Sequence, residues 1–223
     1  MMNNLKLNSL VMLNNPAFHR YNYVYPDHTT KRGDCMASIW ATEKDNTEVN
    51  TLKGNKKTDV LIIGGGMAGI LTAYYLTQSG IDCLLVEGNR IASGVTGNTT
   101  AKITAQHGLI YDTLLRRFGT ELARQYYDVN TAAIGQFTGL SEKIACDLEE
   151  KTAYVYSRTD KKKIEKEAEA YQKLNIPFEW KESIFSLPFH VAGAVGLPLK
   201  YQVHPLKLKQ GLLPKIKYYE NTF

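Results

Sequence analysis

This chain of 223 residues contains few cysteines, and they are not grouped. Its three cysteines, Cys35, Cys83 and Cys146, lie far apart and form no C-x-x-C or C-x-H pattern. Because zinc and iron–sulfur sites need clustered ligands, we expect no metal site built from this chain alone. A sparse, odd set of cysteines is also typical of a reducing compartment, so we expect the cytoplasm.

Long apolar segments are absent as well. No apolar run approaches the ~20 residues that a membrane span requires. The N-terminal stretch MMNNLKLNSLVMLNNP lacks a charged region followed by a sustained apolar region, which a signal peptide would have. We therefore expect neither a membrane anchor nor a membrane partner.

No strong excess of one charge is present. The formal net charge is +5, and the lysines are spread out, with short clusters at 161–163 and 207–217. Solvated helix faces explain such clusters better than a nucleic-acid patch does. We expect no nucleic-acid partner, and the sequence does not indicate the oligomeric state.

Three segments are expected along the chain. Residues 1–55 show no sustained period and are interpreted as a poorly ordered lead-in, although Ile39 and Trp40 need a surface on which to pack. Residues 56–150 contain the clearest periodic pattern. Residues 151–223 are expected to form part of a second domain and to lead back to the first.

A strand–helix–strand unit is predicted at the start of the second segment. Val60–Ile63 is a short apolar run typical of a strand buried on both faces. Helical spacing follows from Met67 to Thr77, and Gly80 has the position of a C-terminal cap. Cys83–Val86 is a second apolar run. Because such a unit crosses over between its strands, they are expected to pair in parallel.

The later elements are predicted from periodicity too. Residues 114–149 are expected to be helical, with a break near Phe118–Gly119. Residues 152–157 alternate as a strand does, and residues 160–175 form an amphipathic helical pattern. The stretch from Gly193 indicates a strand, a turn and a helix with Pro205 in its first turn.

The glycines between the first strand and helix match G-x-G-x-x-G, at Gly64, Gly66 and Gly69. Gly64 permits a tight turn, Gly66 allows close approach of a pyrophosphate, and Gly69 lets the helix lie close to the strand. The helix N-terminus offers N–H groups to phosphates. Glu87 follows the second strand, where its carboxylate can bind ribose hydroxyls. A plain glycine turn with a surface glutamate explains this context less well.

The segment after Glu87 bears on which dinucleotide is bound. Residues 88–102, GNRIASGVTGNTTAK, are dense in Gly, Ser, Thr and Asn. Such a loop can donate hydrogen bonds to a second stretch of cofactor, whereas an NAD domain more often continues directly into a helix. FAD is therefore favoured over NAD, and the glutamate disfavours NADP.

The stretches DVLIIGGGMAGILTAYYL, LLVEGNRIASGVTGNTTAK and YQVHPLKLKQGL resemble the FAD-dependent oxidoreductases of the D-amino-acid oxidase, glycine oxidase and sarcosine oxidase group, the DAO family. SIW and TAKITAQHGLIY resemble a bacterial subgroup whose longer members carry a C-terminal Rieske domain. The resemblance implies an α/β fold: a Rossmann-like FAD-binding domain, with a parallel sheet and flanking helices, over 56–150, and part of an α+β substrate domain over 151–223.

The resemblance also implies a set of FAD-binding residues along the pyrophosphate, the adenosine ribose and the approach to the flavin ring. They are Gly64, Gly66, Met67, Ala68, Gly69, Glu87, Gly88, Arg90, Ser93, Gly94, Thr99, Thr100, Ala101 and Lys102. No catalytic residue is assigned: His107 is a candidate, but a histidine that fixes a loop explains it better. His204 is expected at a helix entry, and no cysteine or histidine is an evident attachment point for covalent FAD.

The implied activity is oxidation of a C–N bond in an amine or amino acid, with hydride transfer to the flavin. Family members run well past this length, so the chain resembles a truncated N-terminal portion and is expected to have little turnover if it is one. Two alternatives stay open: an NAD-dependent dehydrogenase, and a non-catalytic nucleotide-binding remnant.

Overall fold

The structure is a computed structural model that describes residues 11–12, 38, 40, 49–184 and 187–223. These residues form two units, which interleave along the chain. The parallel-sheet unit takes its described residues from Tyr25–Ala101, Ser141–Leu148 and Val203–Phe223; the antiparallel-sheet unit takes them from Met1–Val24, Lys102–Leu140 and Glu149–Gln202. The contiguous division expected from the sequence, at 55/56 and 150/151, stays a prediction, and most of the expected lead-in lies outside the described residues.

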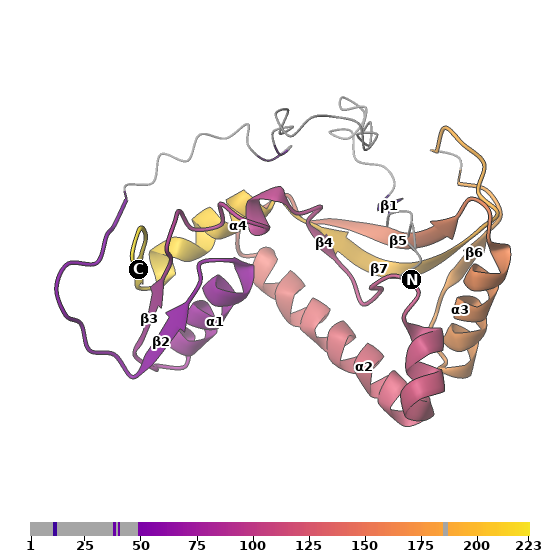
Figure 1. Ribbon diagram of the computed structural model, residues 1–223, viewed down its shortest axis with the longest axis horizontal. Helices are drawn as coiled ribbons and strands as arrows, with labels where there is room; N and C mark the ends of the chain where they lie inside the picture. The colour runs from indigo at the N-terminus through magenta and orange to yellow at the C-terminus, as the bar shows by residue number, and fades with distance from the viewer. Residues whose placement is uncertain (1–10, 13–37, 39, 41–48, 185–186) are drawn as a thin grey trace, which may run out of the picture. The chain divides into compact units, whose positions relative to one another are not determined.

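The parallel-sheet unit contains the predicted strand–helix–strand unit (Figure 1). Its elements are β2 (Val60–Ile63), α1 (Met67–Gln78), β3 (Cys83–Val86), η2 (Thr96–Asn98), α4 (Pro205–Leu212), η3 (Leu213–Lys215) and β8 (Tyr218–Tyr219). The strand order is β2-β3-β8, and both pairs are parallel. The predicted α/β fold with a parallel sheet is confirmed.

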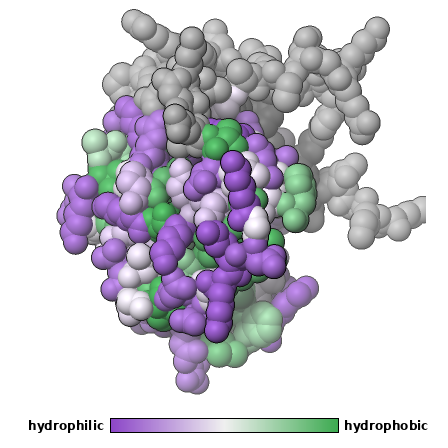
Figure 2. Space-filling view, turned by 90° about the vertical axis from the view of Figure 1, so that its left-hand side faces the viewer, coloured by the Kyte–Doolittle hydropathy of each residue, from purple (hydrophilic) through white to green (hydrophobic). Residues whose placement is uncertain are grey.

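The two faces of this sheet differ in burial. Because side chains alternate along a strand, Ile62 lies on the α1 face, and α1 buries Ile70 and Ala73 in this unit. Leu61 and Ile63 point the other way and are 54% and 82% exposed, so the predicted burial of this strand on both faces is wrong. Viewed from the side where β2 and β3 lie, the surface is mostly hydrophilic, with smaller hydrophobic areas between the polar side chains (Figure 2).

The helix predicted after the last long strand is α4. Pro205 occupies its first turn, and the Nδ1 atom of His204 accepts a hydrogen bond from the Lys207 N–H at 3.3 Å. His204 is therefore the N-cap of α4, which confirms its predicted position at a helix entry.

The antiparallel-sheet unit has two helices and five strands among the described residues. They are β1 (Val11–Met12), β4 (Lys102–Ile103), α2 (Tyr111–Ser141), β5 (Glu149–Ser157), α3 (Lys161–Lys173), β6 (Glu179–Lys181) and β7 (Gly193–Gln202). The strand order is β1-β5-β7-β4, with β6 also on β7, and every pair is antiparallel. Its core includes Ile164 and Tyr171 of α3 with Val195 and Leu197 of β7.

α2 confirms one prediction and corrects another. The predicted break is a kink at Gly119, whose φ of 79° favours glycine. The predicted helix end at Glu149 is wrong, because α2 ends at Ser141 and Glu149 begins β5. Asp147, with a φ of 52°, cannot continue a helix, and the connection turns into the strand instead.

A buried carboxylate caps the start of α2. Glu167 of α3 is fully buried, and its two oxygens accept the backbone N–H groups of Tyr111 at 2.9 Å and Asp112 at 3.0 Å. These N–H groups belong to the first turn of α2, which has no partners for them within the helix. Burial raises the pKa of Glu167, and the two backbone donors oppose that shift.

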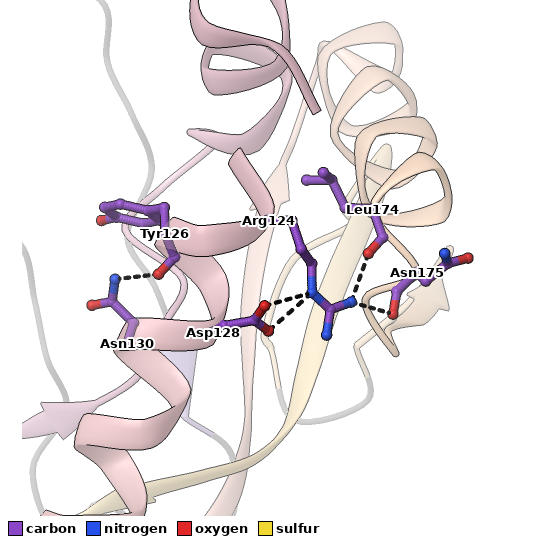
Figure 3. A network of polar contacts seen from close by, with 6 residues as sticks. All are labelled: Arg124, Tyr126, Asp128, Asn130, Leu174 and Asn175. Carbon is purple, nitrogen blue, oxygen red and sulfur yellow. Dashed lines mark hydrogen bonds and ion pairs between the residues drawn. The ribbon is translucent and has the colours of Figure 1, made fainter. Parts of the chain in front are cut away.

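A guanidinium group caps the end of α3 in return (Figure 3). Arg124 of α2 donates from Nη1 to the carbonyl oxygens of Leu174 at 2.8 Å and Asn175 at 3.2 Å. Its Nε donates to Asp128 at 2.9 Å, which holds the group in place. A cation at a helix C-terminus also interacts favourably with the helix dipole. Each helix therefore completes one end of the other.

Among the described residues, no helix has both the length and the apolar character needed to cross a membrane.

Candidate functional site

The glycine-rich turn between β2 and α1 includes Gly64 and Gly69, which the fold itself requires to be glycines. Gly64 has a φ of +107°, and its N–H donates to the Val86 carbonyl oxygen at 2.8 Å. A Cβ atom on Gly69 would lie 2.0 Å from the Gly64 carbonyl oxygen. The first glycine therefore makes the turn and the last lets α1 pack on β2, as the sequence predicts.

Gly66 is different, because no contact with the described residues requires a glycine there. Its φ of −77° and ψ of 177° suit any residue, and a Cβ atom would lie 3.6 Å from the Thr96 Oγ1 atom, an ordinary contact. Gly66 is the N-cap of α1, whose first turn has no acidic residue to offset the positive end of the helix dipole. Open backbone at an uncompensated helix N-terminus suits a phosphate group.

Glu87 is fixed beside this turn. It directly follows β3, and its Oε2 atom accepts the Gly65 N–H at 2.6 Å while Oε1 accepts the Asn89 N–H at 2.8 Å. Two backbone donors therefore orient the carboxylate at the carboxyl end of the parallel strands. Ligands of open α/β sheets bind at this edge.

The loop after β3 folds back onto the glycine turn. The Ala92 N–H donates to the Gly65 carbonyl oxygen at 2.9 Å. The Thr96 Oγ1 atom accepts the Met67 N–H, the first of α1, at 2.9 Å. Since a hydroxyl that accepts a hydrogen bond keeps its own hydrogen to donate, Thr96 can still bind a phosphate oxygen. Thr96 was missed in the predicted set, although it lies inside the predicted loop.

Arg90 and the end of the chain form a second anchor for this loop. Glu220 is 2% exposed; its Oε1 atom accepts the Ile91 N–H at 2.6 Å, and its Oε2 atom lies 3.3 Å from the Arg90 Nη1 atom. The predicted role of Arg90 along the pyrophosphate stays a prediction. Glu220 was also missed, since no local pattern connects it to a residue 130 positions earlier.

The far end of the loop is a tight turn. The Thr99 Oγ1 atom accepts the Ala101 N–H at 3.2 Å, and Ala101 has a φ of 54°. Nearer the middle, the Asn98 side chain donates to the Gly94 carbonyl oxygen at 2.8 Å. This part of the loop is therefore held by local hydrogen bonds.

Most of the predicted cofactor residues lie in the parallel-sheet unit, around the turn and the loop. This group comprises Gly64, Gly66, Met67, Ala68, Gly69, Glu87, Gly88, Arg90, Ser93, Gly94, Thr99, Thr100 and Ala101. Lys102 instead opens β4 of the antiparallel-sheet unit, where burial lowers its pKa. His107, in the same unit, is exposed, and its Nδ1 atom lies 2.7 Å from the Tyr126 hydroxyl. That contact agrees with a histidine that fixes a loop.

Comparison with known proteins identifies the family. The family described as FAD dependent oxidoreductase (DAO) matches residues 59–217. The "Putative Rieske 2Fe-2S iron-sulfur protein YhfW" of Bacillus subtilis (strain 168) is 39% identical over 196 residues, which are 83% of this chain and 38% of that protein.

Two solved structures share the fold. Glycine oxidase from Bacillus cereus ATCC 14579 has a TM-score of 0.54 at 22% identity, covering 74% of this chain and 46% of that one. L-alpha-glycerophosphate oxidase from Mycoplasma pneumoniae with FAD bound has a TM-score of 0.56 at 15% identity, covering 75% and 45%. The chain thus spans less than half the length of each of these three proteins. The family match extends over most of the chain, and FAD is the cofactor of that family. This chain belongs to the family of FAD-dependent oxidoreductases.

Proposed function

We propose that this chain binds FAD as part of an oxidoreductase that oxidises the C–N bond of an amine or amino acid. The observation that carries the proposal is the turn at Gly66. The fold tolerates a side chain there, yet the position holds glycine at an open helix N-terminus. Approach of a pyrophosphate explains the glycine, and the protein's own packing does not.

The surrounding residues fit the adenosine half of FAD. The Thr96 hydroxyl, which accepts the Met67 N–H, can donate its own hydrogen to a phosphate oxygen, and the α1 N-terminus presents the positive end of the helix dipole to the phosphates. The Glu87 carboxylate, oriented by Gly65 and Asn89, can accept hydrogen bonds from ribose hydroxyls. When bound, the flavin would supply the hydride acceptor that no amino-acid side chain provides.

The substrate class rests on the relatives. Glycine oxidase is named for an amino acid, whereas L-alpha-glycerophosphate oxidase is named for a substrate without a C–N bond at the oxidised carbon. We place an amine or amino acid first, since the sequence stretches around the cofactor loop resemble the amine-oxidising group. Glycerol 3-phosphate is the informative competitor.

The first test is the visible absorption spectrum after incubation with FAD and desalting. We expect a retained flavin band for the natural chain, loss of the band for Gly66→Val, and retention for the control Gly135→Val, an exposed α2 position with open space around it. A colourless natural chain, or an unchanged band in Gly66→Val, would overturn the proposal. NADH fluorescence enhancement without flavin binding would favour the NAD alternative.

The second test is anaerobic bleaching of the bound flavin. Glycine, sarcosine, D-amino acids, simple amines and glycerol 3-phosphate are added separately. Bleaching by a compound with a C–N bond supports the substrate class, and bleaching by glycerol 3-phosphate alone contradicts it. Retained flavin that no compound bleaches would overturn the activity and leave a nucleotide-binding chain.

A further inference from the structure

Trp40 contacts the loop of residues 88–102, here called the cofactor loop, from outside the segment that matches the family. The family match begins at residue 59, yet the Trp40 Nε1 atom donates to the Thr99 carbonyl oxygen at 2.7 Å. Its ring lies 4.9 Å from the His204 ring, at an angle of 56°. Trp40, for which the sequence predicts a packing surface, therefore lies against the far end of the loop. Ile39 lies outside the described residues.

The surface under Trp40 is well fixed. His204 is nearly buried, its side chain caps α4, and its backbone N–H donates to the Cys146 carbonyl oxygen at 2.8 Å. An aromatic ring held in this way gives the indole a defined orientation, which aims its single N–H donor at Thr99.

The group that Trp40 holds is the tight turn at the end of the loop. Thr99 accepts the Ala101 N–H through its side chain, and the Ala101 carbonyl oxygen accepts the Val203 N–H at 3.3 Å. With a φ of 54°, Ala101 adopts a conformation that non-glycine residues seldom take. Such a turn needs tertiary contacts to persist, and the indole N–H supplies one.

The residues before the family match also support the other end of the loop. The Asn50 carbonyl oxygen accepts the Glu220 N–H at 2.8 Å, and the Leu52 N–H donates to the Thr222 hydroxyl at 3.2 Å. Glu220 in turn binds the backbone of Ile91. Described residues between 38 and 52 thus contact the elements that hold the loop at both ends.

We propose that Trp40 is a positioning residue for the flavin: its indole N–H and its packing on His204 fix the turn of residues 99–101 in the shape that the cofactor meets. This inference rests on the proposed function. It adds that residues before the family-matched segment are also needed for full cofactor binding.

The test compares Trp40→Phe, which keeps a ring and removes the N–H donor, with Trp180→Phe, the matched change at the chain's only other tryptophan. His204→Asn provides a second variant, since asparagine can still cap α4 while the ring under Trp40 is removed. For each, the FAD dissociation constant, the visible circular dichroism of bound flavin and the thermal midpoint of the FAD-free chain are measured.

We expect Trp40→Phe and His204→Asn to raise the FAD dissociation constant by about three- to tenfold, the range of one lost hydrogen bond. These two variants should also alter the visible circular dichroism, which reports the surroundings of the flavin. Trp180→Phe should leave the FAD dissociation constant and the dichroism unchanged. Unchanged FAD affinity and dichroism in Trp40→Phe would overturn the inference. So would a fall in the thermal midpoint of the FAD-free chain with unchanged dichroism, because that result indicates a purely structural tryptophan. Absence of FAD binding in the natural chain would instead refute the proposed function.

Discussion

Alanine substitutions at Gly66 and at Gly69 should distinguish a glycine needed for cofactor binding from a glycine needed for folding. Both substitutions add one methyl group to the same turn. At Gly69 the new Cβ atom would lie 2.0 Å from the Gly64 carbonyl oxygen, so backbone must move. Overpacking of this kind costs about 1–3 kcal/mol of unfolding free energy.

At Gly66 the same methyl group meets, among the described residues, only the Thr96 hydroxyl, at 3.6 Å, in a backbone conformation open to any residue. Alanine restricts the unfolded chain, which stabilises, but it is a poorer N-cap than glycine, which destabilises; because the two effects oppose each other, we expect stability to change by less than about 1 kcal/mol. The methyl group would, however, occupy space that a pyrophosphate needs. FAD affinity should therefore fall at least about tenfold, or about 1.4 kcal/mol.

Urea unfolding of the FAD-free variants and FAD titration measure the two effects separately. The reasoning predicts that Gly69→Ala lowers stability and that Gly66→Ala lowers affinity alone. Equal destabilisation by both would show that Gly66 serves packing. Normal FAD affinity in a stable Gly66→Ala chain would refute a pyrophosphate at this turn.

Three further outcomes are expected. Glu167→Gln should cost about 1.5–3 kcal/mol of unfolding free energy, because an amide NH₂ cannot accept one of the two backbone N–H groups. Since the pKa of Glu167 is raised in the folded state, the difference in unfolding free energy between the natural chain and this variant is greatest below the unfolded pKa. It should narrow as the pH rises through the folded pKa. Urea unfolding midpoints from pH 4.5 to 8 measure this difference, and a difference that widens with pH would contradict the prediction. Arg124→Ala should cost about 0.5–1.5 kcal/mol in the same assay, and Arg124→Lys should recover only part of it, because one ammonium group cannot match the fork of contacts; full recovery would show that charge alone matters. Thr96→Val should weaken FAD binding in a titration without unfolding the chain, and unchanged affinity would show that its hydroxyl serves only the α1 N-terminus.

Features encoded in contiguous residues were predictable. The strand–helix–strand unit from Val60 to Val86, its glycine turn and the kink at Gly119 each depend on local backbone preferences, which residue type reveals. The entry to α4 at His204 and Pro205 was predictable for the same reason.

Contacts between distant residues were not predictable. The hydrogen bonds between Trp40 and Thr99 and between Glu220 and Ile91 join residues 59 and 129 positions apart, and no local sequence pattern indicates either partner. Glu167 lies on an amphipathic helix whose charges point to solvent at most other positions, so its burial depends on where α2 begins. Such contacts follow from tertiary arrangement, which overrides local pattern.

The exchange of caps between α2 and α3 has a consequence for how this chain opens. If α3 detaches, the first turn of α2 loses the Glu167 oxygens; if α2 detaches, the Leu174 and Asn175 carbonyls directly after α3 lose Arg124. Detachment of either helix therefore exposes one end of the other. Amide hydrogens in the two turns should therefore exchange with deuterium at one common rate, as a single cooperative unit, and a substitution at either cap should accelerate exchange in both.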